Sequence, residues 1–454
     1  MRILISAGEA SGEMYGAQLI EALRLAESGP ETRHRESKSP PSRQERGKDG
    51  APESSSHIEF FGVGGEKMRG AGCDTIIDAK DLSVVGITEI LSHLPKIWGL
   101  FHKLIAVADE RKPDIAIVID SPAFNWRVAR QMKKRGVPVV YYVCPQFWAW
   151  RQGRVKLLRK YVDKALVIFP FEEKFYRDRG VDAEFVGHPL AELPRPTISR
   201  NEYAAMNGLD PATHWITLMP GSRVKEVRMN LPGILGAMAL LGKEYEFLLP
   251  VAATLDSGFV QRLVGSHTST GSAQPPSKSA NVGAAAQREG TAFSRAVTSQ
   301  DETSGTTESR ALPNGLHLVP EALPALAHSR AGIIASGTAT VEAAMMETPF
   351  VMVYRVTSLT YLLGRSTVKV PHFAMANLIA GEQAVPELVQ GDFTPERVAA
   401  EMAKIIPEGE PRETMIAGLR RVRNSLRKDG DADPAERAAR SIFELLRGRM
   451  PVPT

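Results

Sequence analysis

Cysteine is scarce in this chain, and no long hydrophobic run is present. The 454 residues include two cysteines, Cys73 and Cys144, which are far apart and lack the spacing of metal ligands. This usage predicts a reducing compartment and no disulfide framework. No apolar run approaches the ~20 residues of a transmembrane helix, and the N-terminus lacks the apolar core of a secretory signal. We therefore expect a cytoplasmic protein that can touch a membrane without crossing it.

Motifs for metal ions and dinucleotides are also missing. There is no HExxH, CxxC or Walker GKS/T loop, and the glycine turn at 62–70 is not a full GxGxxG. The acidic run 429–433 resembles a metal-binding DxD but lies in a polar stretch between late helices, which favours a solvated turn. A net charge of +4 is too small to indicate nucleic-acid binding, although an anionic substrate is compatible with it. We expect no metal and no other cofactor.

Two segments lack the apolar residues that a folded core needs. Residues 28–57 contain no Val, Ile, Leu, Met, Phe, Trp, Tyr or Cys, and residues 266–311 contain only Val282, Phe293 and Val297 as large apolar residues. Both are predicted to be disordered insertions, because they cannot bury enough surface to offset the entropy of ordering.

Elsewhere, apolar strands alternate with helical stretches, which is typical of parallel sheets covered by helices. The expected strands are 3–5, 58–63, 115–119, 137–143, 165–169, 184–186, 216–219, 246–251, 316–318, 332–335 and 350–353. The predicted fold class is α/β, with two Rossmann-like parallel-sheet domains that face a cleft. We place the domains at 1–190 and 191–430, with a proline-rich junction, and expect residues 431–454 to form a helix that packs back on the N-terminal domain.

Each half of the chain opens with an apolar strand, a small-residue turn and a helix, at 1–23 and at 215–227. Such turns let the backbone approach a ligand at a helix N-terminus. The turn residues are Gly8, Ser11 and Gly12 in the first half, and Gly221 and Ser222 in the second. Arg223 follows the second turn and can pair bidentately with a phosphate. The alternative is a surface arginine on an ordinary helix.

A third turn, rich in hydroxyl groups, follows the expected strand 332–335. Ser336, Gly337 and Thr338 open a helix, and Glu342 lies one turn further on. A glutamate there can accept hydrogen bonds from two ribose hydroxyls, and it can equally complete a capping box with an upstream Ser or Thr.

Polar groups also gather after the last expected strand. Residues 377–382 and 385–390, which include Asn377 and Glu382, are expected on a loop near the same strand ends. Open α/β sheets bind their ligands at these carboxyl ends, so this clustering is typical of a site.

In the first half, Asp120 directly follows the buried strand 115–119 and stands beside Ser121 and Asn125. A carboxylate in this place is a candidate general base, and the alternative is an N-cap of the next helix. Residues 144–154 then set aromatic side chains next to Arg151. Aromatic faces bind sugar rings and arginines bind phosphates, but a tryptophan pair is just as often part of a core.

Together these segments resemble the lipid-A-disaccharide synthase family, whose members are inverting glycosyltransferases of GT-B architecture. The matching stretches are SAGEASGE, GVGGEKM, VGITEIL, DSPAFN, CPQFWAWRQGRV, FPFEEKFY, VGHPL, LMPGSR, ASGTATVE and HFAMANLIAGEQAVPELVQ. They follow the family's order over almost the whole chain except the two insertions. Glu13 stands where the family usually has Asp, and Ala123 stands where a second Asp is common, so Asp120 must act alone as the base.

The resemblance implies the reaction. The family transfers a 2,3-diacylglucosamine unit from its UDP carrier to the 6-hydroxyl of 2,3-diacylglucosamine 1-phosphate, in lipid A and lipopolysaccharide biosynthesis. Asp120 would deprotonate that hydroxyl, while Arg223 and a helix dipole would stabilise the departing UDP without a metal. The alternatives are a UDP-N-acetylglucosamine 2-epimerase, a soluble-sugar transferase and a nucleotide-sugar-binding regulator without turnover.

The resemblance also implies two sets of binding residues. Those for the UDP-sugar are Gly221, Ser222, Arg223, Ser336, Gly337, Thr338, Glu342, Asn377 and Glu382. Those for the acceptor are Ser11, Gly12, Glu13, Glu89, Asn125, Trp150 and Arg151.

Acylated substrates reside in a bilayer, so an apolar face is expected on the acceptor domain. Leu91, Leu94, Ile97, Trp98 and Phe101 recur at helical spacing, with lysines beside them. Without the resemblance, such a stripe is more often a core-facing helix. With it, we expect peripheral contact with the cytoplasmic face of the inner membrane, and a homodimer is compatible with the sequence.

Overall fold

The structure is a computed structural model that describes residues 1–27, 58–82, 87–192, 195–252, 254–268, 312–357, 361, 370–428 and 432–448. The predicted insertion 28–57 lies outside the described residues, as does 269–311 of the second. Residues 266–268 still belong to helix α9 (Ser257–Thr268), so that helix runs into the start of the second predicted insertion.

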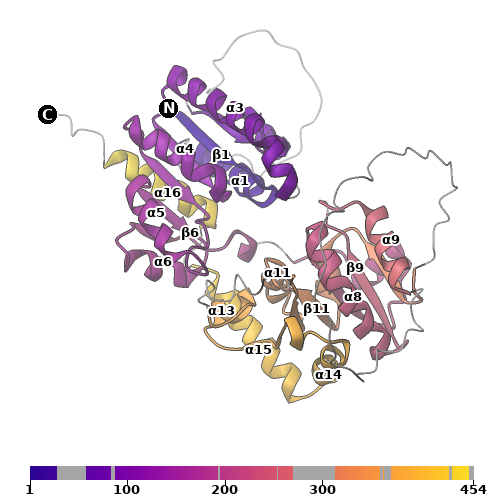
Figure 1. The fold of residues 1–454 in the computed structure, drawn as a ribbon. Coiled ribbons are helices and arrows are strands. Elements are labelled where there is room, and N and C mark those ends of the chain that lie inside the picture. The colour runs from indigo at the N-terminus through magenta and orange to yellow at the C-terminus, as the bar shows by residue number, and fades with distance from the viewer. Residues whose placement is uncertain are drawn as a thin grey trace, which may run out of the picture.

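The N-terminal half forms a seven-stranded parallel sheet (Figure 1) in the order β3-β2-β1-β4-β5-β6-β7. Its strands are β1 (Arg2–Ala7), β2 (Glu59–Gly64), β3 (Cys73–Asp78), β4 (Ile115–Ile119), β5 (Val139–Tyr142), β6 (Lys164–Val167) and β7 (Ala183–Phe185). Its helices are α1 (Ala10–Glu27), α2 (Glu66–Gly70), α3 (Ile87–Arg111), α4 (Pro122–Lys134), α5 (Val155–Tyr161) and α6 (Pro170–Arg177). β4 is fully buried, which explains its continuous apolar run.

The second sheet has six parallel strands in the order β10-β9-β8-β11-β12-β13. These are β8 (His214–Met219), β9 (Tyr245–Pro250), β10 (Leu316–Val319), β11 (Ala331–Ala335), β12 (Phe350–Tyr354) and β13 (Glu387–Val389). The helices are α7 (Arg200–Asn207), α8 (Val224–Leu241), α9, α10 (Ala322–His328), α11 (Ala339–Met346), α13 (Met375–Ala380), α14 (Pro395–Ile405), α15 (Glu410–Ser425) and α16 (Pro434–Arg447). Short 3-10 helices cover Ala79–Asp81, Gln152–Arg154, Pro189–Glu192 and Gln390–Asp392.

In both sheets the strand order reverses direction between two central strands. These are β1 and β4 in the first sheet and β8 and β11 in the second. Side chains at the carboxyl ends of such neighbouring strands face a common crevice, which is where open α/β sheets place their ligands.

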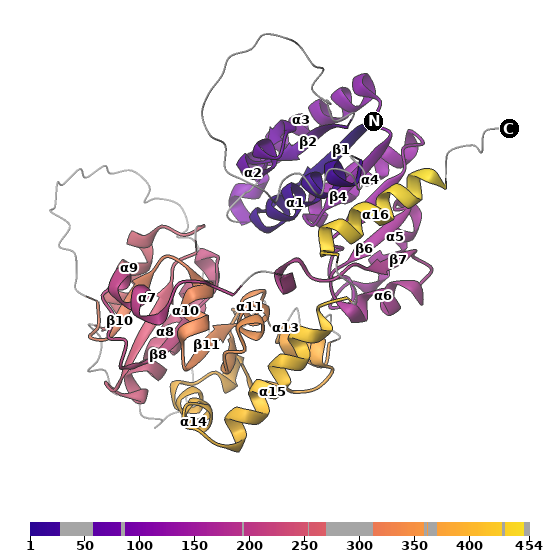
Figure 2. The same cartoon turned by 180° about the vertical axis from the view of Figure 1, so that it is seen from behind.

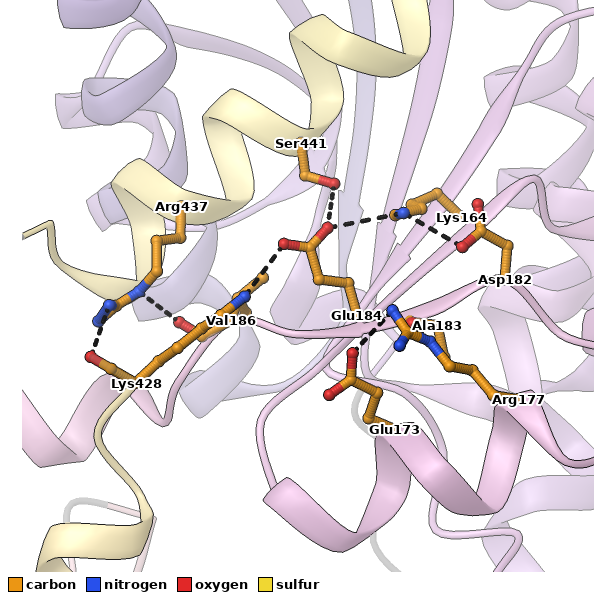
Figure 3. Close-up of polar contacts among 10 residues, drawn as sticks. All are labelled: Lys164, Glu173, Arg177, Asp182, Ala183, Glu184, Val186, Lys428, Arg437 and Ser441. Atoms are coloured by element: carbon orange, nitrogen blue, oxygen red, sulfur yellow. Dashed lines mark hydrogen bonds and ion pairs between the residues drawn. The ribbon is translucent and has the colours of Figure 1, made fainter. Parts of the chain in front are cut away.

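The last helix, α16, crosses back to the N-terminal half and packs against α1 (Figures 1 and 2). Figure 3 shows its polar contacts with the edge strand β7. The Ser441 hydroxyl donates to Glu184 Oε2 over 2.8 Å, and the same carboxylate accepts from Lys428 Nζ over 3.2 Å. The buried Arg437 guanidinium donates to the carbonyls of Val186 (3.0 Å) and Lys428 (2.9 Å). The chain leaves the N-terminal half after Val186 and returns to it after Lys428. Arg437 bonds to both carbonyls, so it holds these two connecting segments together.

Two details differ from the sequence prediction. The sequence analysis missed β3 and β13, because both are edge strands with polar or half-exposed positions and no continuous apolar run. Residues 375–380 form helix α13, and residues 387–389 pair with β12, so the loop expected there was wrong. Residues 429–431 of the acidic run lie outside the described residues. The exposed Asp433 is the N-cap of α16, and its carboxylate accepts from the Glu436 amide, which is compatible with the predicted solvated turn.

The apolar stripe of α3 is divided between the core and the surface. Phe101 is 5% exposed and packs edge-on against Phe124, so its prediction as a membrane contact was wrong. Trp98 is 56% exposed, and Ile97 is half-buried. The side chains of Leu91, Leu94 and Glu89 lie outside the described residues. Within the described part of the chain, no helix is both long and apolar enough to span a bilayer.

Candidate active site

Asp120 lies in a strained turn between β4 and α4. Asp120 and Ser121 have φ values of 47° and 44°, in the left-handed region that non-glycine residues rarely adopt. Two hydrogen bonds to the Asp120 carbonyl hold the turn, from the Tyr141 hydroxyl (2.7 Å) and from Asn125 Nδ2 (2.9 Å). The N-cap of α4 is Ser121, so the Asp120 carboxylate is not used as a helix cap. Strain of this kind is concentrated at functional sites.

Asn125 positions this turn and does not face a ligand. Its side chain is fully buried, and Nδ2 also donates to the carbonyls of Ser6 (3.1 Å) and Ile119 (2.8 Å). Its Oδ1 accepts from the Ser6 hydroxyl over 2.6 Å. The prediction that Asn125 binds the acceptor was therefore wrong, because all its polar atoms tie the ends of β1 and β4 together.

The Asp120 carboxylate has an unusual proton affinity. Burial, and after it the negative charge of Glu9, raise its pKa to about 6. A hydrogen bond from the Ser121 amide and the positive charge of Arg223 oppose this shift. A carboxylate with a pKa near 6 is ionised at neutral pH and still basic enough to accept a proton from a hydroxyl.

The β1–α1 turn packs directly against the Asp120 turn. A Cβ on Gly8 would lie 2.6 Å from Ser121 Oγ, so only glycine permits this approach. Gly12 is buried, and Ser11 is exposed beside it. Glu13 caps another helix: its Oε1 accepts from the Lys67 amide of α2 over 2.7 Å. The carboxylate of Glu13 is thus engaged in the fold rather than free for the acceptor.

On the second sheet, the β8–α8 turn already holds a carboxylate of its own. Gly221 has a φ of 126°, which lets Glu226 fold back over the turn. Glu226 Oε2 accepts from the Ser222 amide over 3.2 Å, and Oε1 accepts from Arg223 Nη1 over 3.1 Å. The Ser222 amide and Arg223 are the groups that the sequence analysis assigned to a diphosphate. In the structure they bind the Glu226 carboxylate instead.

Arg223 also reaches the first sheet. Its Nη2 lies 4.0 Å from Glu9 Oε2, and the arginine side chain is 71% exposed. The two turns that the sequence singled out are therefore neighbours in space, although about two hundred residues separate them.

The β11–α11 turn presents Glu342. Gly337 has a φ of 141°, and the N-cap Thr338 makes no side-chain cap bond, so the capping-box alternative for Glu342 does not apply. Ser336 instead donates its hydroxyl hydrogen to the Phe373 carbonyl over 2.8 Å. Burial raises the pKa of Glu342, whose carboxyl makes no hydrogen bond with the described residues.

Asn377 and Glu382 have other partners. Asn377 is fully buried and exchanges two 2.9 Å hydrogen bonds with the Val385 backbone, so its prediction as a ligand contact was wrong. The exposed Glu382 forms an ion pair with Arg421 of α15.

The aromatic loop after β5 contains one core tryptophan and one surface tryptophan. Trp148 is buried and donates to Glu172 Oε1 over 2.8 Å, whereas Trp150 is 44% exposed. The Arg151 guanidinium lies over the Trp150 ring, 4.5 Å from its centroid. The backbone of Arg151 has a φ of 56°, in the left-handed region. This pair offers an aromatic face and a positive charge at the carboxyl edge of the first sheet.

Sequence reasoning missed Glu9, Tyr15 and Glu226. The charge of Glu9 acts on Asp120, and Glu226 occupies the anion-binding turn. Burial is the main cause of the raised pKa of Tyr15, and the negative charges of Glu342 and Asp120 raise it further. Glu9 is two residues after the end of β1, so its place at a strand end could have indicated it as a candidate site residue. Nothing local in the sequence distinguishes Tyr15 from other core residues.

The two parallel sheets form the fold that GT-B glycosyltransferases and related epimerases share. A UDP-GlcNAc 2-epimerase from Neisseria meningitidis bound to UDP-GlcNAc superposes with a TM-score of 0.56 at 11% identity, over 99% of this chain and all of that one. A calicheamicin glycosyltransferase superposes with a TM-score of 0.51 at 15% identity, over 99% of both chains. At these identities the likeness concerns the fold, and it confirms the predicted α/β architecture.

Sequence comparison then gives the family. The profile of the lipid-A-disaccharide synthetase family matches residues 3–266 and 293–441. The lipid-A-disaccharide synthase of Koribacter versatilis is 46% identical over 446 residues, 98% of each chain. That of Acidobacterium capsulatum is 42% identical over 450 residues, 98% of this chain and 97% of its own. The chain belongs to the lipid-A-disaccharide synthetase family, and it is a hexosyltransferase of lipid A biosynthesis, as its sequence motifs predicted.

Proposed function

We propose that the chain joins UDP-2,3-diacylglucosamine to 2,3-diacylglucosamine 1-phosphate, with the acceptor on the first sheet and UDP on the second. The observation that supports this assignment is that Arg223 of the second sheet reaches the turns of the first sheet. Its Nη2 lies 4.0 Å from Glu9 Oε2, and its positive charge opposes the rise in the pKa of the partly buried Asp120.

In this reaction Asp120 takes the proton from the acceptor 6-hydroxyl as its oxygen attacks the anomeric carbon of the donor. The new carbon–oxygen bond forms as the bond from the anomeric carbon to the UDP oxygen breaks, and UDP leaves with that electron pair. One base is sufficient for inversion at this carbon. The positive charge of Arg223 and the N-terminus of α8 stabilise the diphosphate.

Other residues supply binding. On the donor side, Gly221, Ser222 and the β11–α11 turn lie at strand ends of the second sheet. The carboxyl of Glu342, which has no hydrogen bond with the described residues, suits the ribose hydroxyls. On the acceptor side, the exposed Trp150 and Arg151 suit a sugar ring and its 1-phosphate.

Mixing the purified protein with both acylated sugars tests the function. The disaccharide 1-phosphate should appear by mass spectrometry with one UDP released per product. UDP release without disaccharide, or epimerisation of a UDP-sugar, would contradict the proposal and favour a different GT-B reaction.

Membrane contact is the second part of the proposal. The acyl chains of both substrates require a bilayer surface, and Trp98 stands out from α3 with its ring stacked on Phe101 at 5.6 Å. A partly anchored exposed tryptophan suits the interface of the cytoplasmic leaflet of the inner membrane.

Vesicle flotation tests this contact. Trp98→Ser should weaken binding to anionic vesicles several-fold and leave UDP affinity unchanged, whereas the matched control Leu240→Ser removes a 55% exposed apolar residue from α8 and should change neither. Equal flotation of both variants and the unmodified chain would place the membrane contact elsewhere.

A further inference from the structure

The stretch FPFEEKFY is one of those that match the family, and the reaction proposed above gives it no part. It forms most of α6 and the residue before it, and two of its polar side chains, Glu172 and Tyr176, lie four residues apart on one face of the helix. Glu172 is 1% exposed, and Tyr176 has no exposed surface. A buried carboxyl group costs stability unless it is hydrogen-bonded, so its partners indicate what it does in the fold.

Both oxygens of the Glu172 carboxyl have donors. Oε2 accepts from the Phe169 amide over 3.1 Å, at the N-terminus of α6, where backbone amides have no partner within the helix. Oε1 accepts from Trp148 Nε1 over 2.8 Å, in the aromatic loop that follows β5. Capping of the helix therefore accounts for only one of the two oxygens, and the other joins α6 to the loop.

α6 holds the first part of this loop at two points. The Tyr176 hydroxyl donates to the Pro145 carbonyl, and Glu172 binds the Trp148 indole. The Trp148 ring also packs edge-on against Phe171, with 4.9 Å between the ring centroids. The loop is thus fixed against α6 from Pro145 to Trp148.

Trp150 and Arg151 belong to the segment that follows. The Trp148 carbonyl accepts from Gln152 Nε2 over 3.0 Å, so the two ends of this segment are tied together. Between them, Arg151 has a φ of 56°, a conformation that a non-glycine residue keeps only where the surrounding structure holds it. The orientation of the exposed Trp150 and Arg151 therefore depends on the position of Trp148.

We propose that Glu172 is a positioning residue for acceptor binding, which holds Trp150 and Arg151 in place through the indole of Trp148. This rests on the proposed function, in which Trp150 and Arg151 meet the acceptor sugar and its 1-phosphate. Because Glu172 is buried and acts through the loop, its removal should weaken acceptor binding and leave proton transfer at Asp120 and the binding of UDP intact.

Glu172→Gln tests the proposal, because an amide has one acceptor oxygen and its NH2 group would face one of the two donors. The KM for the acceptor should rise about tenfold, as for a lost hydrogen bond. The kcat and the KM for UDP-2,3-diacylglucosamine should stay within about twofold of those of the unmodified chain. A merely structural role would instead reduce the amount of folded enzyme, which lowers the apparent kcat and leaves the acceptor KM unchanged.

Trp148→Phe removes the same hydrogen bond from the other side and keeps an aromatic ring. It should raise the acceptor KM to a similar extent, and it gives the measurement even if Glu172→Gln does not fold. The double variant should be no worse than the more affected single variant, because the two side chains act as one unit.

Glu173→Gln is the matched control. Glu173 is the next residue of α6 and forms an ion pair with Arg177 over 2.8 Å (Figure 3), so its loss should leave the acceptor KM unchanged. An unchanged acceptor KM in Glu172→Gln or Trp148→Phe, an equal rise in the KM of both substrates, or additive effects of the two substitutions would each overturn the role of Glu172. A normal acceptor KM in Arg151→Ala would instead count against the acceptor site of the proposed function.

Discussion

The β4–α4 turn and the β8–α8 turn have the same construction and opposite chemistry. Each follows a strand at the point where the sheet order reverses, and each is tied down by a buried asparagine. In the first, Asn125 links the ends of β1 and β4. In the second, Asn230 donates to the Pro220 carbonyl and accepts from the Arg355 amide, both over 3.0 Å, which links the ends of β8 and β12.

The difference lies in exposure and strain. The first turn forces a non-glycine residue into the left-handed region and partly buries the Asp120 carboxylate, which raises its pKa to about 6. The second uses Gly221 for its positive φ and leaves Arg223 mostly exposed between two carboxylates. A base needs desolvation to gain proton affinity, whereas an arginine that binds and releases a diphosphate must be able to exchange partners.

Removing the carboxylate of the first turn should have the largest effect. Asp120→Asn should lower kcat by ~10²–10⁴, the range for a positioned general base, and its melting temperature should not fall, since burial disfavours the charge that is removed. The control Asp114→Asn changes a carboxylate beside the opposite end of β4, where Asp114 accepts from the Arg2 amide. Near-normal turnover of Asp120→Asn would move the base to another residue, such as Glu9, whose charge acts on Asp120.

Arg223→Ala should have the next largest effect, about 3 kcal/mol of transition-state stabilisation, or roughly 10² in kcat/KM. UDP should also bind more weakly, because the same charge faces the diphosphate before and after the reaction. Arg228→Ala, an exposed arginine on the same helix, is the matched control. Equal effects of the two substitutions would mean that general positive charge, rather than the turn, is what matters.

The pH profile of activity should reflect the burial of Asp120 in the first turn. Because Asp120 must be ionised to accept a proton and its pKa is raised to about 6 in the free protein, kcat/KM should fall about tenfold per pH unit below that value. In Glu9→Gln, which removes a negative charge that favours protonation, the acid limb should move to lower pH. An acid limb near pH 4 in the unmodified chain would contradict the desolvated state of Asp120.

The central strands and the turns that follow them were predictable from the sequence. Continuous apolar runs identify buried parallel strands, and ligands gather at their carboxyl ends, so the places of Asp120 and Arg223 after the central strands could be predicted without a structure. The roles of Asn125 and Asn377 could not, because a polar residue near a strand end has the same pattern whether it points inward or outward. Tyr15 was missed because its apolar neighbours at helical spacing indicate only a core face.

The smallest effect should come from Glu226→Gln. In the free protein the Glu226 carboxylate accepts hydrogen bonds from the Ser222 amide and Arg223, which are the groups proposed to bind the diphosphate. The loss of its charge should therefore tighten UDP binding. The gain should be about two- to fivefold at low salt, because an exposed ion pair contributes little. Weaker UDP binding in this variant would show that Glu226 orients the arginine rather than competing with the diphosphate.

Titration of UDP into Asp120→Asn and Arg223→Ala by calorimetry tests most directly whether the first turn serves proton transfer and the second serves diphosphate binding. Asp120→Asn should bind UDP within about threefold of the unmodified chain, or slightly more tightly, because a negative charge near Arg223 is gone. Arg223→Ala should lose at least tenfold in affinity. Comparable losses in both variants would contradict the separation of proton transfer and diphosphate binding on which this account depends.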